Sequence, residues 1–200
     1  VKEQLFKITH TQNVNPRLNV GFNLNFIGSR GYYGYSSGIA QNVSDVNAAA
    51  FAWYESKSKR YNLLTNLIYN NLKTPITGSI VNDSVFSVGS INKAGEVVRL
   101  PAAYDSWKGG SFYLKQFYYI GHIDSTTNGK NKATILPTQR VAVTVRYDAT
   151  KYEFRQNGAD TYNVFPDYYY SYNRSHDSLM FRHLQTDFSY SFYLRSKSET

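Results

Sequence analysis

The sequence predicts an all-β fold, an antiparallel up-and-down transmembrane β-barrel or a contiguous segment of one, with short periplasmic turns and long extracellular loops. Three observations carry this prediction. Apolar and polar residues alternate with a period of two, the links between alternating segments are short and long by turns, and no stretch approaches the ~20 apolar residues of a transmembrane helix. Residues 1–200 are expected to form a single barrel segment, part of a longer barrel.

Residues 18–26 give the clearest strand signal. They read Leu-Asn-Val-Gly-Phe-Asn-Leu-Asn-Phe, so every even position is apolar and every odd position is Asn or Gly. A strand sends successive side chains to opposite faces, whereas a helix would spread these Asn residues around its surface. The segment therefore predicts a strand with one apolar and one polar face, and its length matches the span of a tilted strand across a bilayer.

Six further segments are compatible with strands, namely residues 4–11, 46–55, 61–72, 112–120, 140–147 and 181–194. In residues 140–147, Val141 and Val143 alternate with Arg140 and Ala142. In residues 181–194, Phe188 and the preceding Asp187 are expected on opposite faces. The alternation in residues 46–55 leaves the facing of that segment open. No segment shows a convincing helical period, so the chain is expected to be all-β.

The links between these segments differ in length in a regular order. Residues 13–16 and 56–59 form tight polar turns, whereas residues 27–45 and 73–111 form long links, the second with a hairpin of its own through residues 92–95. Residues 148–178 form another long link. Short periplasmic turns and long extracellular loops alternate in this way in outer-membrane barrels. Residues 122–138 depart from the order, because a short turn is expected there. Seven segments is also an odd number, whereas single-chain bacterial barrels have even counts.

The composition is unusual for a soluble core. Hydrophobic residues make up 42%, but 19 Tyr and 12 Phe account for much of that share. Tyr suits an interface between apolar and wet surroundings because its ring is apolar and its hydroxyl needs a partner. The 22 Lys and Arg exceed the 14 Asp and Glu, but they are scattered, which favours solvated turns over nucleic-acid binding. With no cysteine, disulfides, thiolate zinc sites and Cys nucleophiles are excluded.

The alternation alone fits both a membrane barrel and a soluble β-sandwich, because either fold gives a strand one apolar and one polar face. Strand lengths near nine residues, unequal links and tyrosines at strand ends favour the barrel. The tyrosines expected in an aromatic girdle or loop are Tyr32, Tyr33, Tyr61, Tyr69 and Tyr147.

In a barrel, the residues at the polar positions would line a wet interior, and those at the apolar positions would face lipid. The residues expected to line the pore are Asn19, Asn23, Asn25, Asn62, Asn66, Asn70, Arg140, Arg146 and Arg182. The Asn residues would supply neutral hydrogen-bonding groups, and the Arg residues would favour anions.

Two other function classes are compatible with parts of the sequence. His183 with Asp187 or Ser189 is a candidate for the Ser and His of an outer-membrane lipase, but no GxSxG, HExxH, GxxxxGK[ST] or EF-hand pattern is present. No catalytic residue, metal site or cofactor is therefore expected. The second alternative is a soluble or surface-exposed β domain that binds glycans through its tyrosine-rich loops, residues 168–172 with Tyr32, Tyr33 and Tyr35.

The sequence also resembles a known family. The runs LFKITHTQNVNPRLNVGFNLNFIGSRGYY (residues 5–33), YESKSKRYNLLTNLIYNNLK (54–73), GSIVNDSVF (78–86), LPTQRVAVTVRY (136–147) and NGADTYNVF (157–165) are similar to the putative porin family of Bacteroidetes outer membranes. The resemblance implies an outer-membrane barrel, made with a signal peptide and longer than this chain, with no catalytic residues. The partners expected for such a barrel are outer-membrane lipid and small hydrophilic solutes, without nucleic acid, and a homo-oligomer stays open. Trp53 departs from the small or polar side chain expected there.

Overall fold

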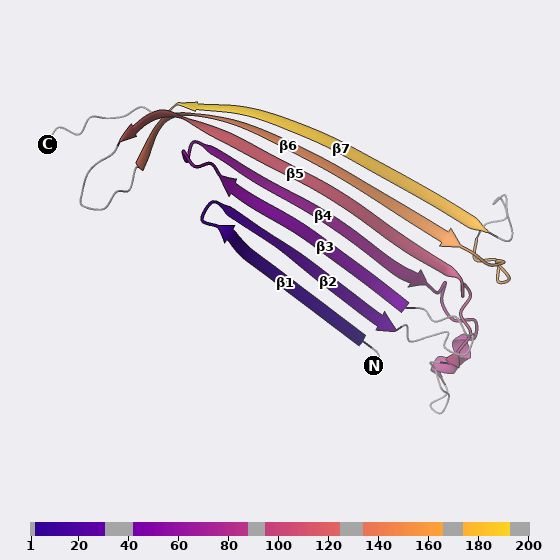
Figure 1. Cartoon of the computed structure of the whole chain (residues 1–200). Coiled ribbons are helices and arrows are strands. Elements are labelled where there is room, and N and C mark those ends of the chain that lie inside the picture. Colours follow the sequence, from indigo (N-terminus) through magenta and orange to yellow (C-terminus); the bar gives the residue numbers. More distant parts are fainter. Residues whose placement is uncertain (1–2, 31–41, 88–94, 125–133, 166–173, 193–200) are drawn as a thin grey trace.

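The computed structural model of the chain describes residues 3–30, 42–87, 95–124, 134–165 and 174–192, and for residues 85–86, 122–124 and 134–138 it describes only the backbone. One antiparallel sheet dominates (Figure 1). Its strands are β1 (Glu3–Asn15), β2 (Leu18–Arg30), β3 (Asn42–Glu55), β4 (Tyr61–Ile76), β5 (Ala103–Asp124), β6 (Thr134–Gln156) and β7 (Ser175–Phe192). The strands pair in chain order, so the prediction of an all-β, up-and-down arrangement is confirmed.

Helical structure is minor in the described part of the chain. A short 3-10 turn, η2 (Asp83–Phe86), lies in the β4–β5 link, where the Asn82 side chain accepts a hydrogen bond from the Ser84 backbone N–H. None of the helical structure in the described ranges is long and apolar enough to span a membrane.

The pairing register carries the period of two across the whole sheet. Leu24 of β2 lies opposite Ile8 of β1 and Ala48 of β3, and the same row continues to Tyr69 of β4. We call the side that carries Leu24 the apolar face, and the opposite side, which carries Asn23, the polar face. Because side chains alternate along every strand, the register assigns each residue to one of these two faces.

The facing of β3, which its sequence left open, is decided by its neighbours. Ala48 lies opposite Leu24 on the apolar face, so Phe51 and Trp53 project from the polar face. Trp53 lies directly opposite Asn19, so the strand keeps its polar-face parity despite the large side chain.

The apolar face carries a continuous band. Six strands each contribute a nine-residue segment with five side chains on this face, residues 18–26, 46–54, 61–69, 112–120, 141–149 and 184–192. We call these segments together the apolar band. No second layer covers them among the described residues, and Leu184 and Phe188 are 67% and 72% exposed. The band therefore presents a wide apolar surface outward.

The band runs obliquely to the strands. Leu18 begins the band in β2, yet its row passes through Tyr54, Leu63, Gln116 and Val143 to Phe188, the middle band residue of β7. A drift of four residues over five strand spacings corresponds to a tilt of about 30°, from ~3.3 Å per residue and ~4.8 Å between strands. Barrel strands are tilted by about 35–45° from the barrel axis, so the oblique band is typical of a barrel wall.

All four of the longer predicted links are shorter than expected because the strands continue into them. The pairing of β5 with β6 extends to Asp124 and Thr134, so the link expected over residues 122–138 is reduced to residues 125–133. At the other end, β6 continues to Gln156. These extensions lack clean apolar alternation, and paired backbone groups stabilise them instead. A bulge between Ile120 and Gly121 accommodates Pro137 opposite Gly121.

The short turns lie at one end of the sheet and the long links at the other (Figure 1). In the β1–β2 turn the side chain of Asn15 accepts a hydrogen bond from the Arg17 N–H at 2.9 Å. In the β3–β4 turn Lys59 has a φ of 57°, and its N–H donates to the Ser56 carbonyl at 2.8 Å. The predicted order of short and long links is therefore confirmed for the first four strands.

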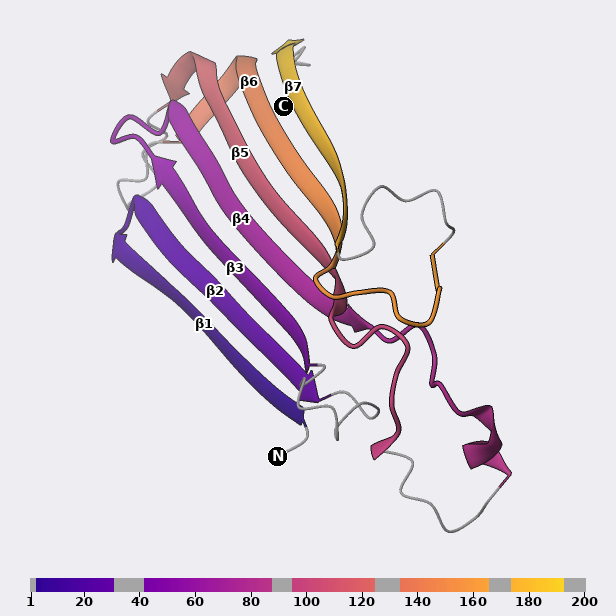
Figure 2. The same cartoon turned by 90° about the vertical axis from the view of Figure 1, so that its right-hand side faces the viewer.

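The sheet is curved but not closed, so the prediction of a barrel holds only as a segment of one (Figure 2). β1 pairs only with β2 and β7 only with β6. The reason is geometric, because seven strands in chain order leave the outer edges of β1 and β7 without a partner among the described residues.

The small buried core lies at the loop end instead of within the sheet. Ile80 and Val98 form an isolated antiparallel bridge in the β4–β5 link, and both are buried. Gly78, with a φ of 63°, packs against the buried Leu100. This link projects from the end of the sheet with η2 (Figure 2). The bridge agrees with a hairpin, whose predicted turn at residues 92–95 lies mostly outside the described residues.

Candidate functional site

The polar face is the candidate functional surface, because it gathers hydrogen-bonding side chains from every strand. One row across four strands reads Lys7, Asn25, Asn47 and Asn70. The predicted pore residues Asn19, Asn23, Asn25, Asn62, Asn66 and Asn70 all share this face. Their spacing of two or four residues within a strand is what brings them to one side.

Some of these amides pair with neighbours and others do not. Asn19 Nδ2 donates to Asn13 Oδ1 at 2.7 Å, and Thr11 Oγ1 donates to Asn19 Oδ1 at 3.3 Å. The Oδ1 atoms of Asn23, Asn25 and Asn66 accept no hydrogen bond from the described residues. These three oxygens are shielded by neighbouring side chains, so each needs a hydrogen bond from an ordered water or from a rearranged neighbour.

Arg140 and Arg146 extend the polar face across β6, but their electrostatic surroundings differ. Arg146 Nε lies 2.7 Å from Asp148 Oδ2, and Ser111 Oγ donates to the other carboxylate oxygen at 2.6 Å. Arg140 lies opposite Tyr119 and Ser191 and makes no ion pair with any carboxylate of the described residues. The positive charge of Arg146 is therefore offset locally, whereas that of Arg140 is not.

The expectation that Arg182 joins these residues is wrong. Arg182 pairs with Ala149 of β6, a residue of the apolar band, whereas Arg146 pairs with Gln185 on the polar face. The physical reason is parity, because Arg182 and Phe188 are an even number of residues apart and must share a face.

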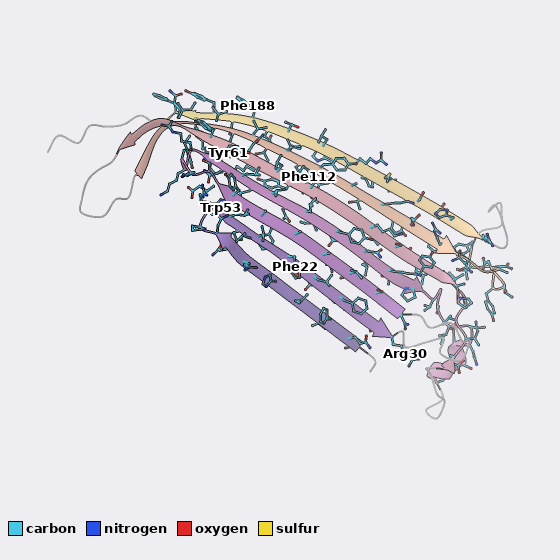
Figure 3. The ribbon with its side chains drawn as sticks, viewed as in Figure 1. Phe22, Arg30, Trp53, Tyr61, Phe112 and Phe188 are labelled. Atoms are coloured by element: carbon cyan, nitrogen blue, oxygen red, sulfur yellow. The ribbon has the colours of Figure 1, made fainter. Side chains whose placement is uncertain are left out.

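The polar face also holds aromatic side chains that the sequence did not single out as site residues. Phe51, Trp53, Tyr113 and Phe117 project from it beside the Asn residues, and Figure 3 labels Trp53. A Cβ atom on Gly21 would overlap the ring of Phe51, so the glycine provides the space in which that ring lies. The signal was the strict alternation in residues 18–26, in which Gly21 occupies a polar-parity position.

The predicted girdle tyrosines that the structure describes lie on the apolar face. Tyr61 and Tyr118 are direct partners at the short-turn margin of the apolar band, and the Tyr61 hydroxyl donates to Gln116 Oε1 at 3.1 Å. Tyr69 is the last residue of the apolar band in β4. In β6 the band ends at Ala149, and Tyr147 is the residue before it on the same face. Tyr32 and Tyr33 lie outside the described residues, as do the tyrosines of residues 168–172.

At the long-link end of the polar face, two aromatic rings lie beside a carboxylate. The Trp107 and Tyr152 rings are 4.6 Å apart, and the Tyr152 hydroxyl donates to Asp105 Oδ1 at 2.8 Å. This hydrogen bond, followed by desolvation, raises the pKa of Tyr152. Trp107 is half exposed, so its ring is open to a ligand that stacks.

Comparison with known proteins decides the family. The family described as putative porin matches residues 1–199 of the chain. The chain belongs to the putative porin family. No curated protein and no solved structure matches it significantly.

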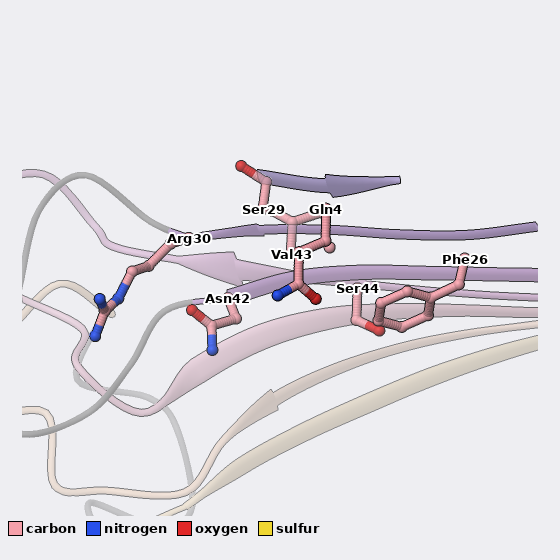
Figure 4. Close-up of a pocket in the computed structure, with 8 residues that line it drawn as sticks. Gln4, Phe26, Ser29, Arg30, Asn42, Val43 and Ser44 are labelled. Carbon is pink, nitrogen blue, oxygen red and sulfur yellow. The ribbon is translucent and has the colours of Figure 1, made fainter. Parts of the chain in front are cut away.

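For a member of the porin family, the two faces of the sheet have different significance. The apolar band matches the lipid-facing surface of a barrel wall, and the polar face matches the side turned to the lumen. A pocket at the long-link ends of β1, β2 and β3 is lined by Gln4, Phe26, Gly28, Ser29, Arg30, Asn42, Val43 and Ser44 (Figure 4). It includes residues of both faces, so it lies at the sheet margin instead of on the polar face.

The candidate lipase residues of this porin-family chain are arranged differently from a nucleophile and its base. His183 Nδ1 lies 4.0 Å from Asp148 Oδ2, whereas Ser189 pairs with Ala142, about 20 Å along β7 from His183 and too far to donate to its imidazole. Asp187 accepts a hydrogen bond from Gln185 at 3.0 Å. Among the described residues no group of three His, Cys, Asp or Glu side chains is placed to hold a metal ion.

Proposed function

We propose that this sheet is a section of the wall of an outer-membrane β-barrel channel, through which small hydrophilic solutes diffuse passively. The observation that carries the proposal is the uncovered apolar band. Its area is roughly 900 Å², from ~30 Å along and ~29 Å across the strands. Patches on soluble monomers reach about 300–600 Å², so an aqueous environment would leave this surface unfavourably exposed.

The polar face supplies the other half of the proposal. It would line a water-filled lumen with Asn, Thr and Lys side chains that exchange hydrogen bonds with water. Diffusion needs no covalent step. In this proposal Ser111, Asp148 and His183 are therefore structural residues of the barrel wall and not catalytic residues. The unpaired charge of Arg140 gives the lumen a preference for anions.

Closure of the proposed barrel needs further strands. In lipid, the open edges of β1 and β7 would leave backbone groups without hydrogen bonds, which costs several kcal/mol for each group. An eight-stranded barrel has an interior filled by side chains, whereas barrels of about 16–18 strands leave an aqueous channel. We therefore propose that additional strands, from the same polypeptide or from another copy, complete a wider barrel.

Conductance across a planar lipid bilayer tests the proposal with the full-length protein refolded in detergent. We expect discrete current steps and, under a KCl gradient, a reversal potential that indicates anion preference. Arg140→Gln should reduce that preference, and Asp148→Asn should increase it by leaving Arg146 unpaired. Arg182→Gln is the matched control, because its side chain lies on the apolar face and should leave selectivity unchanged.

A protein that gives no steps and stays folded and monodisperse without detergent would contradict the channel. In that case a soluble glycan-binding domain is the better account. The Trp107 and Tyr152 rings, which lie in tilted contact beside Asp105, favour this second candidate, since aromatic faces and carboxylates together suit sugar rings. Steps that are cation-selective in the wild type would retain the channel and remove the anion preference.

A further inference from the structure

The apolar face carries a group of basic side chains just beyond the apolar band, on the side of the long links. These residues are Lys73, Lys108, Lys151, Arg155 and Arg182, and we call them the basic patch. They come from four adjacent strands, β4 to β7. All five share the face of Phe112 and Val145, so they point the same way as the band and not into the proposed lumen.

The arrangement of the basic patch is electrostatically unfavourable without an anion. Lys108 and Lys151 lie directly opposite each other on paired strands, and like charges at such positions repel. Lys73 is held close by, with its Nζ 3.9 Å from the centre of the Tyr104 ring. The aromatic ring stabilises this cation but does not neutralise it.

One carboxylate lies at the centre of the patch. Glu153 is 3% exposed and is the only acidic side chain on this face among the described residues of β4 to β7 beyond the band. Its Oε1 lies 2.6 Å from Lys151 Nζ and 3.1 Å from Arg155, and its Oε2 lies 3.8 Å from Lys108 Nζ. These hydrogen bonds, from Lys151 first and then Arg155, lower the pKa of Glu153 to about 2, so it stays ionised.

Glu153 therefore orders the cations without cancelling them. A single negative charge faces five positive ones, and the side chains of Lys108, Lys151 and Arg155 are still 50%, 38% and 40% exposed. The neighbouring His176, whose Nε2 lies 3.5 Å from Glu153 Oε1, adds a further donor when it is protonated. The exposed donors have unused capacity for oxyanions.

The position of the patch specifies the kind of anion. In β6 the apolar band ends at Ala149, and Lys151 follows two residues later on the same face. In a membrane this places the basic patch at the depth of the lipid headgroups, where clusters of Lys and Arg attract anionic lipid. A soluble anion in the lumen would not reach it, because the patch faces away from the polar face.

We propose that the basic patch binds the phosphate groups of a lipid headgroup in the leaflet on the long-link side of the sheet. The inference rests on the proposed membrane barrel and adds a specific lipid site to it. The phosphate would occupy the space between Lys73 and Lys108, while Lys151 and Arg155 remain engaged with Glu153.

The test uses the full-length protein in detergent micelles with added bisphosphorylated lipid A, dephosphorylated lipid A or phosphatidylglycerol, and native mass spectrometry counts the retained lipid. The variant K73Q/K108Q removes two charges and keeps the hydrogen bonds of Glu153 to Lys151 and Arg155. We expect it to retain the phosphorylated lipids roughly tenfold more weakly than the wild type. The matched control K7Q/K115Q removes two charges from the polar face and should retain lipid normally.

Conductance of the same samples separates the two proposals. If the wild type conducts but K73Q/K108Q retains phosphorylated lipid as well as the wild type, the lipid site is refuted and the channel stands. If dephosphorylated lipid A is retained equally, or millimolar inorganic phosphate displaces the lipid, headgroup recognition is refuted. If the wild type forms no pore and is soluble without detergent, the membrane barrel fails and the lipid site fails with it.

Discussion

Arg182 and His183 are neighbours in the chain, yet they face opposite sides of the sheet. Arg182 lies opposite Ala149 on the apolar face, and His183 lies opposite Asp148 on the polar face. At the scale of single residues, parity decides the environment, and residue type does not. The same parity that places Phe188 on the apolar face already places Arg182 there, so the sequence contained the signal that corrects its own prediction.

Gly21 leaves no room for a side chain on the polar face. Replacing it with Val should destabilise the sheet by about 1–3 kcal/mol, because the new side chain would overlap the Phe51 ring and approach the His10 carbonyl. Urea unfolding from detergent micelles measures the change. Gly109→Val is the matched control on the same face, since the nearest atom to a Cβ there is Thr150 Oγ1 at 4.0 Å. Equal losses for the two variants would contradict this account.

Glu153 gives a pH dependence with a defined sign. Its pKa is lowered from 4.5 to about 2, so the ionised carboxylate is favoured in the folded state and stabilises the sheet above pH 4.5. That stabilisation should be lost as the pH falls from about 4.5 through about 2. Urea midpoints measured for the wild type and Glu153→Gln should converge over this range. A difference that stays constant down to pH 2 would show that the ion pairs do not stabilise the fold.

At the scale of elements, the local alternation predicted where strands occur, but it did not predict how long they are. Six of the seven predicted segments lie wholly within observed strands, and the seventh, residues 181–194, coincides with β7 up to Phe192, because alternation is a local property of the chain. β5 and β6 are 22 and 23 residues long, well beyond their alternating segments. Only the presence of a paired partner stabilises such extensions, so their ends could not be derived from either segment alone.

β3 offers a direct test of the two faces. Ala50 lies on the apolar face opposite Leu67, and its neighbour Ala49 lies on the polar face opposite Ile68. Ala50→Arg should destabilise the protein folded in lipid vesicles by about 2–4 kcal/mol, because the charge would enter the hydrocarbon. Ala49→Arg should have a much smaller effect, since its side chain would meet water. Denaturant titration of both variants measures this, and a greater loss for Ala49→Arg would reverse the assignment of the faces.

At the scale of the whole molecule, the open edges are the main consequence of the topology. If further strands close the barrel, the backbone N–H groups on the outer edge of β1 should be protected from hydrogen exchange in the full-length, membrane-inserted protein. In residues 1–200 expressed alone they should exchange faster by orders of magnitude, while the amides of β4 stay slow in both samples. Fast exchange at β1 in the inserted full-length protein would mean that closure does not occur at this edge.

The sequence by itself determined the strands, their order and the division into an apolar and a polar parity, because each depends on residues close together in the chain. It also carried the family resemblance that the comparison confirmed. Only the tertiary structure shows the register, which joins the separate parities into two continuous faces and places Arg140 and Arg146 on the same face as the Asn residues. It also brought Lys108 of β5 and Lys151 of β6 into contact with Glu153, and it placed Lys73 of β4 in the same row of the sheet as Glu153. Contacts between residues far apart in sequence depend on how whole strands align, and no local pattern specifies that alignment.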